Sequence, residues 1–371
     1  MQIAPHVGPG SGVGAVAFHL EQEWKAAGHE VSSFTLSEAR GGWIPTGLTG
    51  IAEKTALAAR VVWFSTVGTV LARRYLAGLP PETVSVCHND VLTGDVYVNH
   101  GNLIAAMEAR GRPWLRLLRN PLHLFTTLRD AIRYRSTIHR SVVNLSTIED
   151  ELLRKTFGQV VPTTWVIPNG VDLEVYRPPT EAERREARRA LGLGERDRAV
   201  LFVGHEFGRK GLFPLIDAVL LLPEHHHLVV VGGDETELTR LRRDERVRDL
   251  AHRCHLVGAT DPAPFYWASD VLVQASAYES YGLVVTESLA SGLPVISTPV
   301  GCASDVIDPG RNGYLTTPSP AEIAARIQDV ETLPARRVRQ AARESVRTLS
   351  WTEVSRVYLS RLEALALRSQ P

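Results

Sequence analysis

The chain has 371 residues, which is too long for one compact core of ordinary size and suits two α/β domains. Its 41 Lys and Arg residues equal its 41 Asp and Glu residues in number, which excludes a net field that would by itself attract nucleic acid. The cysteines, Cys87, Cys254 and Cys302, are far apart and form no Cys-x-x-Cys pair, which argues against a disulfide framework or a thiolate zinc site. We therefore expect a cytoplasmic protein.

Membrane-spanning and secretory segments are not expected. The most apolar stretch, residues 61–72, is shorter than the roughly 20 residues that a spanning helix needs, and we interpret it as a buried helix. The first residues lack the basic and then apolar segments of a signal peptide. The sequence thus predicts a protein that is soluble or bound peripherally to a membrane.

Short apolar strands alternate with longer amphipathic segments along the chain, and this alternation predicts parallel sheets covered by helices. The expected strands of the first half are residues 2–7, 31–36, 84–87, 96–100 and 141–145. The pattern restarts after Pro178, with expected strands at residues 199–203, 227–231, 254–257, 271–274 and 294–297. We therefore expect two Rossmann-like α/β domains.

A turn-rich and then highly charged passage, residues 166–189, separates the two strand series and is typical of a domain junction. We place the N-terminal domain at residues 1–175 and the C-terminal domain at residues 176–350. A last amphipathic helix is expected from about Trp351 to Leu367.

Two cations follow the first strand of the second series. Arg209 and Lys210 lie between Gly208 and Gly211, just before a helix expected to start near Leu212. A strand-to-helix turn presents free backbone amides and the positive end of a helix, and a guanidinium with an ammonium suits a diphosphate. The alternative is that both are solvated charges beside a turn.

Two glutamates follow a later strand. Glu279 comes just after the strand that ends near Gln274, and Glu287 lies eight positions farther on, inside an expected helix. Eight positions span little more than two helical turns, so both carboxylates are expected on one side, where they would accept hydrogen bonds from sugar hydroxyls. The backbone amides of residues 282–284, at the start of that helix, are suited to phosphate. The alternative is that Glu279 caps the helix and Glu287 is a surface acid.

Residues 279–287 and 292–296, with Gly301 and the segment Asn312–Leu315, resemble the donor domain of family 4 glycosyltransferases, which have the GT-B fold. The resemblance extends to residues 28–31, 168–172 and 268–270. In its Arg-Lys-Gly motif the chain is most similar to lipopolysaccharide core glucosyltransferases. His205 departs from the commoner pattern of this family, which has arginine at that position.

The resemblance implies two Rossmann-like domains facing each other across a cleft, with residues 351–371 crossing back to the N-terminal domain. It implies retaining transfer of a hexose from a nucleoside diphosphate sugar, with a UDP-sugar favoured and a GDP-sugar as the alternative, and with no metal and no further cofactor. It places Glu279 on the transferred sugar and Glu287 on the ribose. It places Arg209 and Lys210 on the diphosphate, and Tyr281, Gly282, Leu283 and Val284 around the donor.

In the N-terminal half, the resemblance places Gly12 and Gly14 on a glycine loop that closes over the diphosphate, and it points His100 at the reacting sugar, where it would orient the sugar or share in proton handling. Without the resemblance, the glycines form a tight turn and His100 is structural. The segment Gly10–Ala15 also fits a degenerate dinucleotide motif, with Glu38 as its ribose acid.

The run His225–His227 has no obvious carboxylate partner and is not expected to bind metal. Residues 112–140, from Arg112 to Arg140, combine arginines with Trp and Leu, which suits the surface of an anionic membrane as well as a pair of packed helices. We expect a glycan or lipid-linked envelope acceptor at the inner face of the plasma membrane. Two other functions stay open: a dinucleotide-dependent oxidoreductase and a non-catalytic glycan-binding protein.

Overall fold

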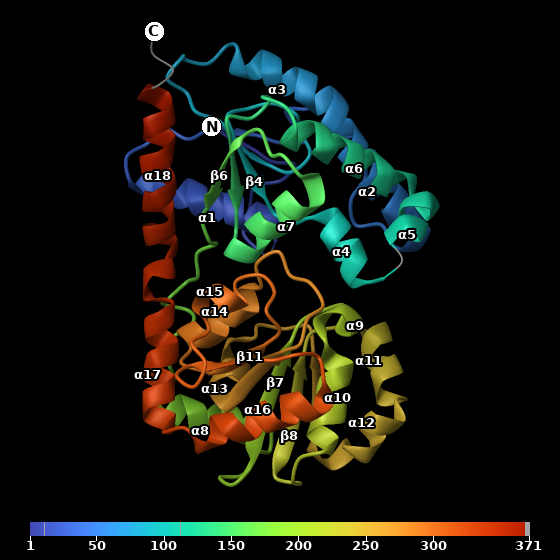
Figure 1. Ribbon diagram of the computed structural model, residues 1–371, viewed down its shortest axis with the longest axis vertical. Helices are drawn as coiled ribbons and strands as arrows, with labels where there is room; N and C mark the ends of the chain where they lie inside the picture. The colour runs from blue at the N-terminus through green and yellow to red at the C-terminus, as the bar shows by residue number, and fades with distance from the viewer. Residues whose placement is uncertain (11, 112, 368–371) are drawn as a thin grey trace. The chain divides into compact units, whose positions relative to one another are not determined.

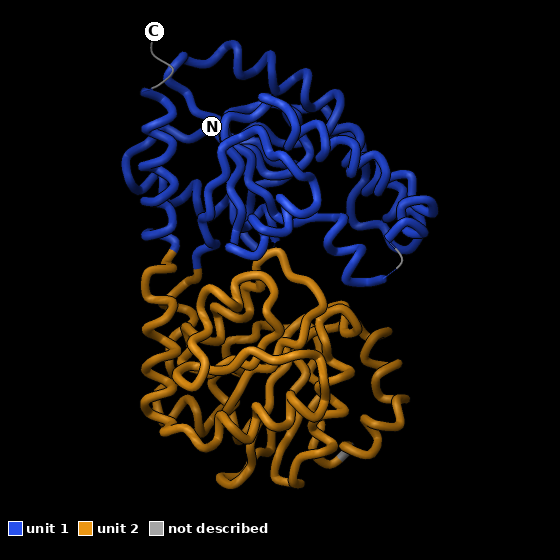
Figure 2. The backbone as a smooth tube through the Cα atoms, in the orientation of Figure 1, with its two compact units in different colours: residues 1–170, 351–371 blue, residues 171–350 orange. Residues whose placement is uncertain are grey.

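The computed structural model describes residues 1–10, 12–111 and 113–367. The chain divides into two compact units, each with its own parallel sheet (Figure 2). Unit 1 contains residues 1–170 and 351–371, and unit 2 contains residues 171–350. The last helix therefore belongs to unit 1, as the resemblance implies for the fold.

The sheet of unit 1 has six parallel strands in the order β2-β1-β3-β4-β5-β6. Its strands are β1 (Gln2–Ile3), β2 (Ser33–Phe34), β3 (Val86–His88), β4 (Val96–Asn99), β5 (Ser141–Asn144) and β6 (Thr163–Val166). Each of the five expected segments overlaps one of these strands, and β3 runs one residue beyond its segment, whereas β6 was not expected. β6 is partly exposed at the edge of the sheet, so it lacks the apolar run that marks its neighbours.

Helices surround this sheet (Figure 1). They are α1 (Val13–Ala26), α2 (Gly50–Trp63), the π-helix η1 (Phe64–Gly68), α3 (Thr69–Leu76), α4 (Leu103–Ala109), α5 (Pro113–Arg119), α6 (Pro121–Tyr134), α7 (Thr147–Phe157) and α18 (Trp351–Leu367). The last helix packs on α1, where the rings of Trp24 and Tyr358 meet edge to face with centroids 6.1 Å apart. Both side chains are almost fully buried, so α18 completes the core of unit 1.

One continuous helical segment, α2 to α3, is more exposed than the sequence suggests. The segment Gly50–Leu76 is 27 residues long and, by length and composition alone, apolar enough to cross a membrane. Only 33% of its most apolar window is buried. Phe64 and Ala72 pack in the core of unit 1, whereas Val62 and Val70 are exposed. The expectation of a buried helix at residues 61–72 is therefore wrong for its outward side.

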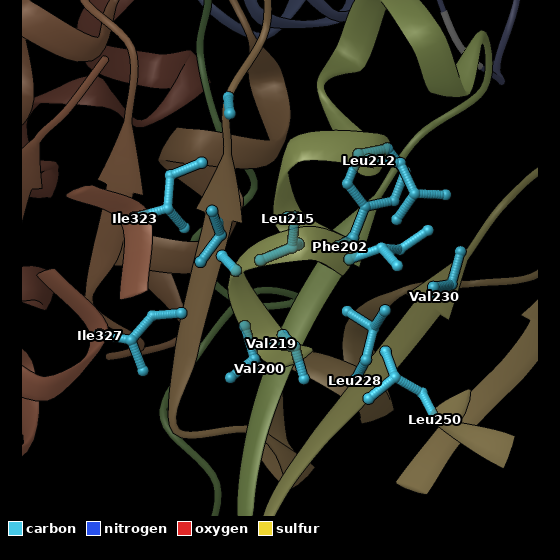
Figure 3. Close-up of a cluster of buried hydrophobic side chains, with 14 of the residues drawn as sticks. Val200, Phe202, Leu212, Leu215, Val219, Leu228, Val230, Leu250, Ile323 and Ile327 are labelled. Carbon is cyan, nitrogen blue, oxygen red and sulfur yellow. The ribbon is translucent and has the colours of Figure 1, made fainter. Parts of the chain in front are cut away.

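Unit 2 contains a second six-stranded parallel sheet, in the order β12-β11-β10-β7-β8-β9. Its strands are β7 (Arg198–Val203), β8 (His226–Val231), β9 (Cys254–Gly258), β10 (Val271–Gln274), β11 (Val295–Ser297) and β12 (Gly313–Leu315). All but β12 match the expected strands. Val200, Phe202, Leu228 and Val230 point from the central strands into a core shared with Leu215 (Figure 3). Burial of both sheet faces explains why these strands are continuous apolar runs.

The helices of unit 2 cover this sheet. They are α8 (Glu181–Ala190), α9 (Phe207–Lys210), α10 (Leu212–Leu220), α11 (Glu235–Arg242), α12 (Glu245–Asp249), the 3-10 helix η2 (Ala251–Arg253), α13 (Ala263–Ala268), α14 (Leu283–Ala290), α15 (Ala303–Val306), α16 (Pro320–Thr332), α17 (Ala335–Ser345) and the 3-10 helix η3 (Arg347–Leu349). Reciprocal capping boxes fix the starts of α8 and α11. The loops that follow β7 and β10 lie side by side at the carboxyl ends of the sheet, where α/β proteins bind ligands.

Candidate active site

The turn after β7 carries the two expected cations. Glu206 adopts a left-handed conformation and precedes the one-turn helix α9, on which Arg209 and Lys210 lie. Gly211 separates α9 from α10 with φ +81°, and a Cβ atom there would lie 2.1 Å from the carbonyl oxygen of Ala275. This contact requires glycine, and it brings the turn against the end of β10.

Arg209, Lys210 and Glu279 form one ionic cluster at this edge of the sheet. The Nζ atom of Lys210 lies 2.6 Å from Oε1 of Glu279, and Nη1 of Arg209 lies 3.6 Å from the same oxygen. Arg209 also donates to the carbonyl oxygen of Tyr278 and forms an ion pair with Glu206. The structure therefore brings three predicted site residues together, and two acids balance the two cations.

A hydrogen-bond chain orients Glu279. Ser276 donates to Oε1 of Glu279 at 2.8 Å, and the amide nitrogen of Gln274 donates to Ser276 at 2.8 Å. All three side chains are buried. Ser276 and Gln274 were not predicted as site residues, although both lie within five positions of Glu279 at the end of β10. The polar Gln274 closing an otherwise apolar strand is the signal that would have identified them.

Glu279 and Glu287 do not lie on one helix, so the prediction that helical spacing places their carboxylates on one side is wrong. α14 begins only at Leu283, after Gly282 with φ +88°, and Glu279 lies in the preceding loop. Left-handed backbone at Gly282 ends the loop and sets the direction of the helix. The position of Glu279 is fixed by its contacts with Lys210 and Ser276 instead.

Glu287 lies on α14 in a separate environment. The hydroxyl group of Tyr266 donates to Oε2 of Glu287 at 2.8 Å, and Tyr266 itself is buried. Burial raises the pKa of the Glu287 carboxyl to about 7, while the bond from Tyr266 and the charge of Lys210 lower it. The surroundings of Glu287 therefore favour its neutral form more than water would.

The other predicted donor-side residues contribute mainly backbone. The side chain of Tyr281 is buried, and its carbonyl oxygen accepts a hydrogen bond from the amide of Cys302 at 2.7 Å. Gly282, Leu283 and Val284 are partly exposed at the N-terminal turn of α14. Amides in the first turn of a helix have no partner within that helix, so this turn is suited to an anion.

His205 stands where the family more often has arginine. Its Nδ1 atom accepts a hydrogen bond from the amide of Gly233 at 3.2 Å. The ring therefore joins the turns that follow β7 and β8.

In unit 1, the glycine segment lies between β1 and α1. Gly12 caps α1 with φ +76°, Gly14 lies in the first turn of that helix, and a Cβ atom at Gly12 would meet nothing within 4 Å. The positive φ requires glycine at Gly12, and the open space around it leaves room for a ligand. Ser11, between the two glycines, lies outside the described residues.

His100 follows β4 and contacts a second histidine. Its Nε2 atom lies 2.9 Å from Nδ1 of His88, whose own Nε2 lies 2.8 Å from Oε1 of Gln2. Burial lowers the pKa of His100 to about 3. Sequence reasoning missed Gln2, because only the register of β1 beside β3 brings it next to His88.

Two alternatives can be compared with the structure. Glu38, the ribose acid of the dinucleotide hypothesis, accepts hydrogen bonds from both the amide and the hydroxyl of Thr35, which lower its pKa. In the described part of the chain, one group of side chains has metal-like spacing: His225, His226 and Glu331. Nδ1 of His226 lies 3.0 Å from the carbonyl oxygen of Pro223, and Nε2 lies 2.8 Å from Oε1 of Glu331, so the expectation that this run lacks a carboxylate partner is wrong.

Residues 112–140 were expected to form a basic surface, but two of their arginines are buried in the structure. Arg129 and Arg133 are buried and pair with Asp130, and the guanidinium of Arg133 lies 3.9 Å from the centroid of the Tyr97 ring. These two arginines therefore belong to the core of unit 1, and leucines occupy the exposed face of α6. Arg112 lies outside the described residues.

Comparison with known proteins decides the family of unit 2. Residues 183–345 match the family model described as glycosyl transferases group 1. Unit 2 is a group 1 glycosyltransferase domain. The ionic cluster, Glu287 and the N-terminal turn of α14 all lie within this group 1 domain.

A curated relative of this chain is a D-inositol 3-phosphate glycosyltransferase of Xylanimonas cellulosilytica. It is 32% identical over 238 residues, which are 60% of this chain and 56% of the relative. The chain thus matches little more than half the length of that relative.

Solved structures with the same fold include sucrose-phosphate synthase from Thermosynechococcus elongatus, with a TM-score of 0.74, 22% identity and 100% of both chains covered. WaaG, a glycosyltransferase involved in lipopolysaccharide biosynthesis, has a TM-score of 0.73 and 17% identity over 97% of this chain and 99% of its own. Anabaena Alr3699/HepE, in complex with UDP and glucose, has a TM-score of 0.66 and 18% identity over 98% and 99% of the chains. These similarities establish the GT-B fold of two Rossmann-like units, and the expected fold class is confirmed.

Proposed function

We propose that the protein transfers a hexose from a UDP-sugar to a hydroxyl group, with retention of the anomeric configuration and without a metal ion. The observation that carries the proposal is the cluster of Arg209, Lys210 and Glu279 at the carboxyl ends of β7 and β10. A cationic pair beside a buried carboxylate suits a ligand that joins a diphosphate to a polyhydroxylated ring.

We expect a bound diphosphate to replace Glu279 as the ionic partner of Lys210. Lys210 is paired with Glu279 at 2.6 Å, and both side chains are largely buried. A diphosphate brings more negative charge than one carboxylate, so it attracts Lys210 away from Glu279. The released carboxylate then accepts hydrogen bonds from hydroxyls of the transferred sugar, while Ser276 keeps it oriented.

The chemical step follows from these roles. The bond between the anomeric carbon and the diphosphate oxygen breaks, and Arg209 and Lys210 stabilise the negative charge that develops on UDP. The acceptor oxygen forms its bond to the same face of the anomeric carbon, and its proton passes to an oxygen of the leaving phosphate. The family resemblance assigns Glu287 to the ribose, and we propose that it orients the nucleotide there.

The test is UDP binding by isothermal titration calorimetry, in EDTA and then in magnesium. Losing one charge-assisted hydrogen bond of about 2 kcal/mol weakens UDP binding by about thirtyfold, so we expect this loss in Lys210→Ala and in Arg209→Ala. Arg311→Ala is the matched control, because Arg311 is an exposed arginine of unit 2 with a surface ion pair. Unchanged affinity in both site variants would exclude the cluster as the diphosphate site.

Retention and donor identity need a product assay. Transfer from UDP-glucose, followed by proton NMR of the anomeric signal, is expected to give an axial linkage from the axial donor. A product of inverted configuration would refute the front-face route. If NADH binds and no UDP-sugar binds, the dinucleotide hypothesis replaces this one; binding without turnover would instead favour a glycan-binding protein.

For the acceptor, we propose a glycan or lipid-linked envelope component at the inner face of the plasma membrane. The support comes from α5 and α6, on which Trp114, Leu118, Leu124, Leu128 and Ile132 are exposed. Arg116 and Arg119 are exposed on α5 as well. Apolar side chains flanked by arginines favour the interface of an anionic membrane.

A neighbouring helical segment also exposes apolar side chains. Arg129 on α6 donates to the hydroxyl of Ser65 in η1, so α6 lies beside the segment Gly50–Leu76 (Figure 1). That segment exposes Ile51, Leu57 and Val62. In the sedimentation of phosphatidylglycerol vesicles, Trp114→Ser with Leu118→Ser is expected to reduce binding at least about tenfold, because two apolar anchors are lost.

The control for vesicle binding is Leu221→Ser, an equally exposed leucine of unit 2. Equal binding by the wild type and the double variant would remove the membrane surface from the proposal. The acceptor assay should also include inositol and hexose phosphates, since the similar proteins named above include an inositol-phosphate glycosyltransferase and sucrose-phosphate synthase.

A further inference from the structure

A hydrogen-bonded chain of polar side chains crosses three strands of unit 1. The amide nitrogen of Gln2, on β1, donates to the carbonyl oxygen of Ala17 in α1 at 2.6 Å. Oε1 of Gln2 lies 2.8 Å from Nε2 of His88 on β3, and Nδ1 of His88 lies 2.9 Å from Nε2 of His100, just after β4. Gln2 and His88 are fully buried, whereas His100 is partly exposed.

The carbonyl oxygen of Ala17 stands at one end of this series of hydrogen bonds and determines which group donates each of them. A carbonyl oxygen only accepts, so the group of Gln2 that faces Ala17 is its NH2, and its oxygen faces His88. Nε2 of His88 must then carry a proton. In a neutral ring Nδ1 is bare, so the bond between the rings is donated by Nε2 of His100.

Both rings are held neutral by their surroundings. Burial lowers the pKa of His88 well below its ordinary value, and the neighbouring His100 lowers it further. No acid lies within the chain of contacts from Ala17 to His100 in the described structure. A neutral His100 with a proton on Nε2 has a lone pair on Nδ1.

We propose that Gln2 and His88 are positioning residues that hold His100 in the Nε2-protonated form, so that its bare Nδ1 accepts a hydrogen bond from a sugar hydroxyl. This inference rests on the proposed function and on the family resemblance, which points His100 at the transferred sugar. His100 then acts as an acceptor that recognises a hydroxyl donor. It disfavours a carboxylate at the same place, because two acceptors would face each other.

Nitrogen NMR of the histidine rings tests the first half of this proposal. In the full-length protein labelled with 15N-histidine, His88 and His100 are expected to show a protonated Nε2 and a bare Nδ1 between pH 6 and 8. His139 is a control within the same unit, because its buried Nδ1 faces the carbonyl oxygen of Gly94 and must carry the proton. A protonated Nδ1 on His100 would overturn the proposal.

Variants of His88 test the second half. In His88→Asn, the amide oxygen takes the place of Nδ1 and keeps the acceptor for His100, whereas His88→Leu removes it. One neutral hydrogen bond of about 1 kcal/mol corresponds to about fivefold in affinity, so we expect the preference for UDP-glucose over UDP to fall about fivefold in His88→Leu and to be retained in His88→Asn.

The affinity for UDP alone separates this proposal from the function on which it rests. UDP affinity is expected to be unchanged in both His88 variants, and the His139 signal confirms that unit 1 is folded. If His88→Leu keeps the wild-type preference for UDP-glucose, the positioning role is refuted. If the wild-type protein binds neither compound, the proposed function fails, and the NMR result still decides the tautomer.

Discussion

Replacing Glu287 with glutamine is expected to stabilise unit 2 while weakening nucleotide binding. The carboxyl has a pKa raised from its ordinary 4.5 to about 7, and burial is the largest cause. Between these two values the folded protein keeps a proton that the unfolded chain releases, so the free energy of unfolding falls as the pH rises. Glutamine does not titrate and still offers an oxygen to the hydroxyl of Tyr266.

The size of the effect follows from the same pKa. One pKa unit corresponds to about 1.4 kcal/mol, so the full displacement amounts to about 3 kcal/mol above pH 7. For a unit of this length, that corresponds to a rise in Tm of roughly 6–12 °C for Glu287→Gln at pH 8. Below pH 4.5 the two proteins should be equally stable, because both side chains are then neutral in the folded and unfolded states.

Differential scanning calorimetry from pH 4 to pH 8 measures this difference, with Glu235→Gln as a control on an exposed acid. UDP titration of the same samples is expected to show weaker binding by Glu287→Gln. A difference in Tm that does not grow with pH would refute the assignment of the raised pKa to Glu287. Unchanged UDP affinity would refute its role on the ribose.

Two other substitutions test packing. Gly211→Ala is expected to weaken UDP binding and lower the Tm of unit 2, because its Cβ would meet the carbonyl oxygen of Ala275 at 2.1 Å; Gly192→Ala, at φ +70° in open space, should cost only the backbone strain of about 1 kcal/mol. Arg133→Met is expected to destabilise unit 1 by about 3 kcal/mol, measured by urea unfolding, since it breaks a buried pair with Asp130. Equal losses from both glycine variants, or no loss from Arg133→Met, would contradict these accounts.

The strands of both sheets were predictable wherever burial on both faces leaves a continuous apolar run. β10 was expected at the residues where it lies, because its apolar run follows the polar Asp270 and ends at the polar Gln274. β6 and β12 were missed, since a partly exposed edge strand and a three-residue strand beginning with glycine carry no such run. Strand prediction therefore depended on where each strand lies in its sheet.

For the site residues, the sequence indicated which residues matter but not which of them are in contact. Arg209, Lys210 and Glu279 were chosen from local motifs, and the structure adds the contact between them because β7 and β10 are neighbours in the sheet. Sequence spacing gave the wrong reason for pairing Glu279 with Glu287. Gln2 and His88 are separated by 86 positions, and only the pairing of β1 with β3 places them in contact.

Unit 1 consists of two separate stretches of the chain, and the second of these is synthesised last. A ribosome completes residues 171–350, and hence all of unit 2, before it adds α18. Until then the face of α1 that carries Leu20 and Trp24 lacks the helix that covers it in the finished protein. Unit 2 can therefore fold on the nascent chain while unit 1 waits, and the earliest-made half of the protein is the last to reach its native structure.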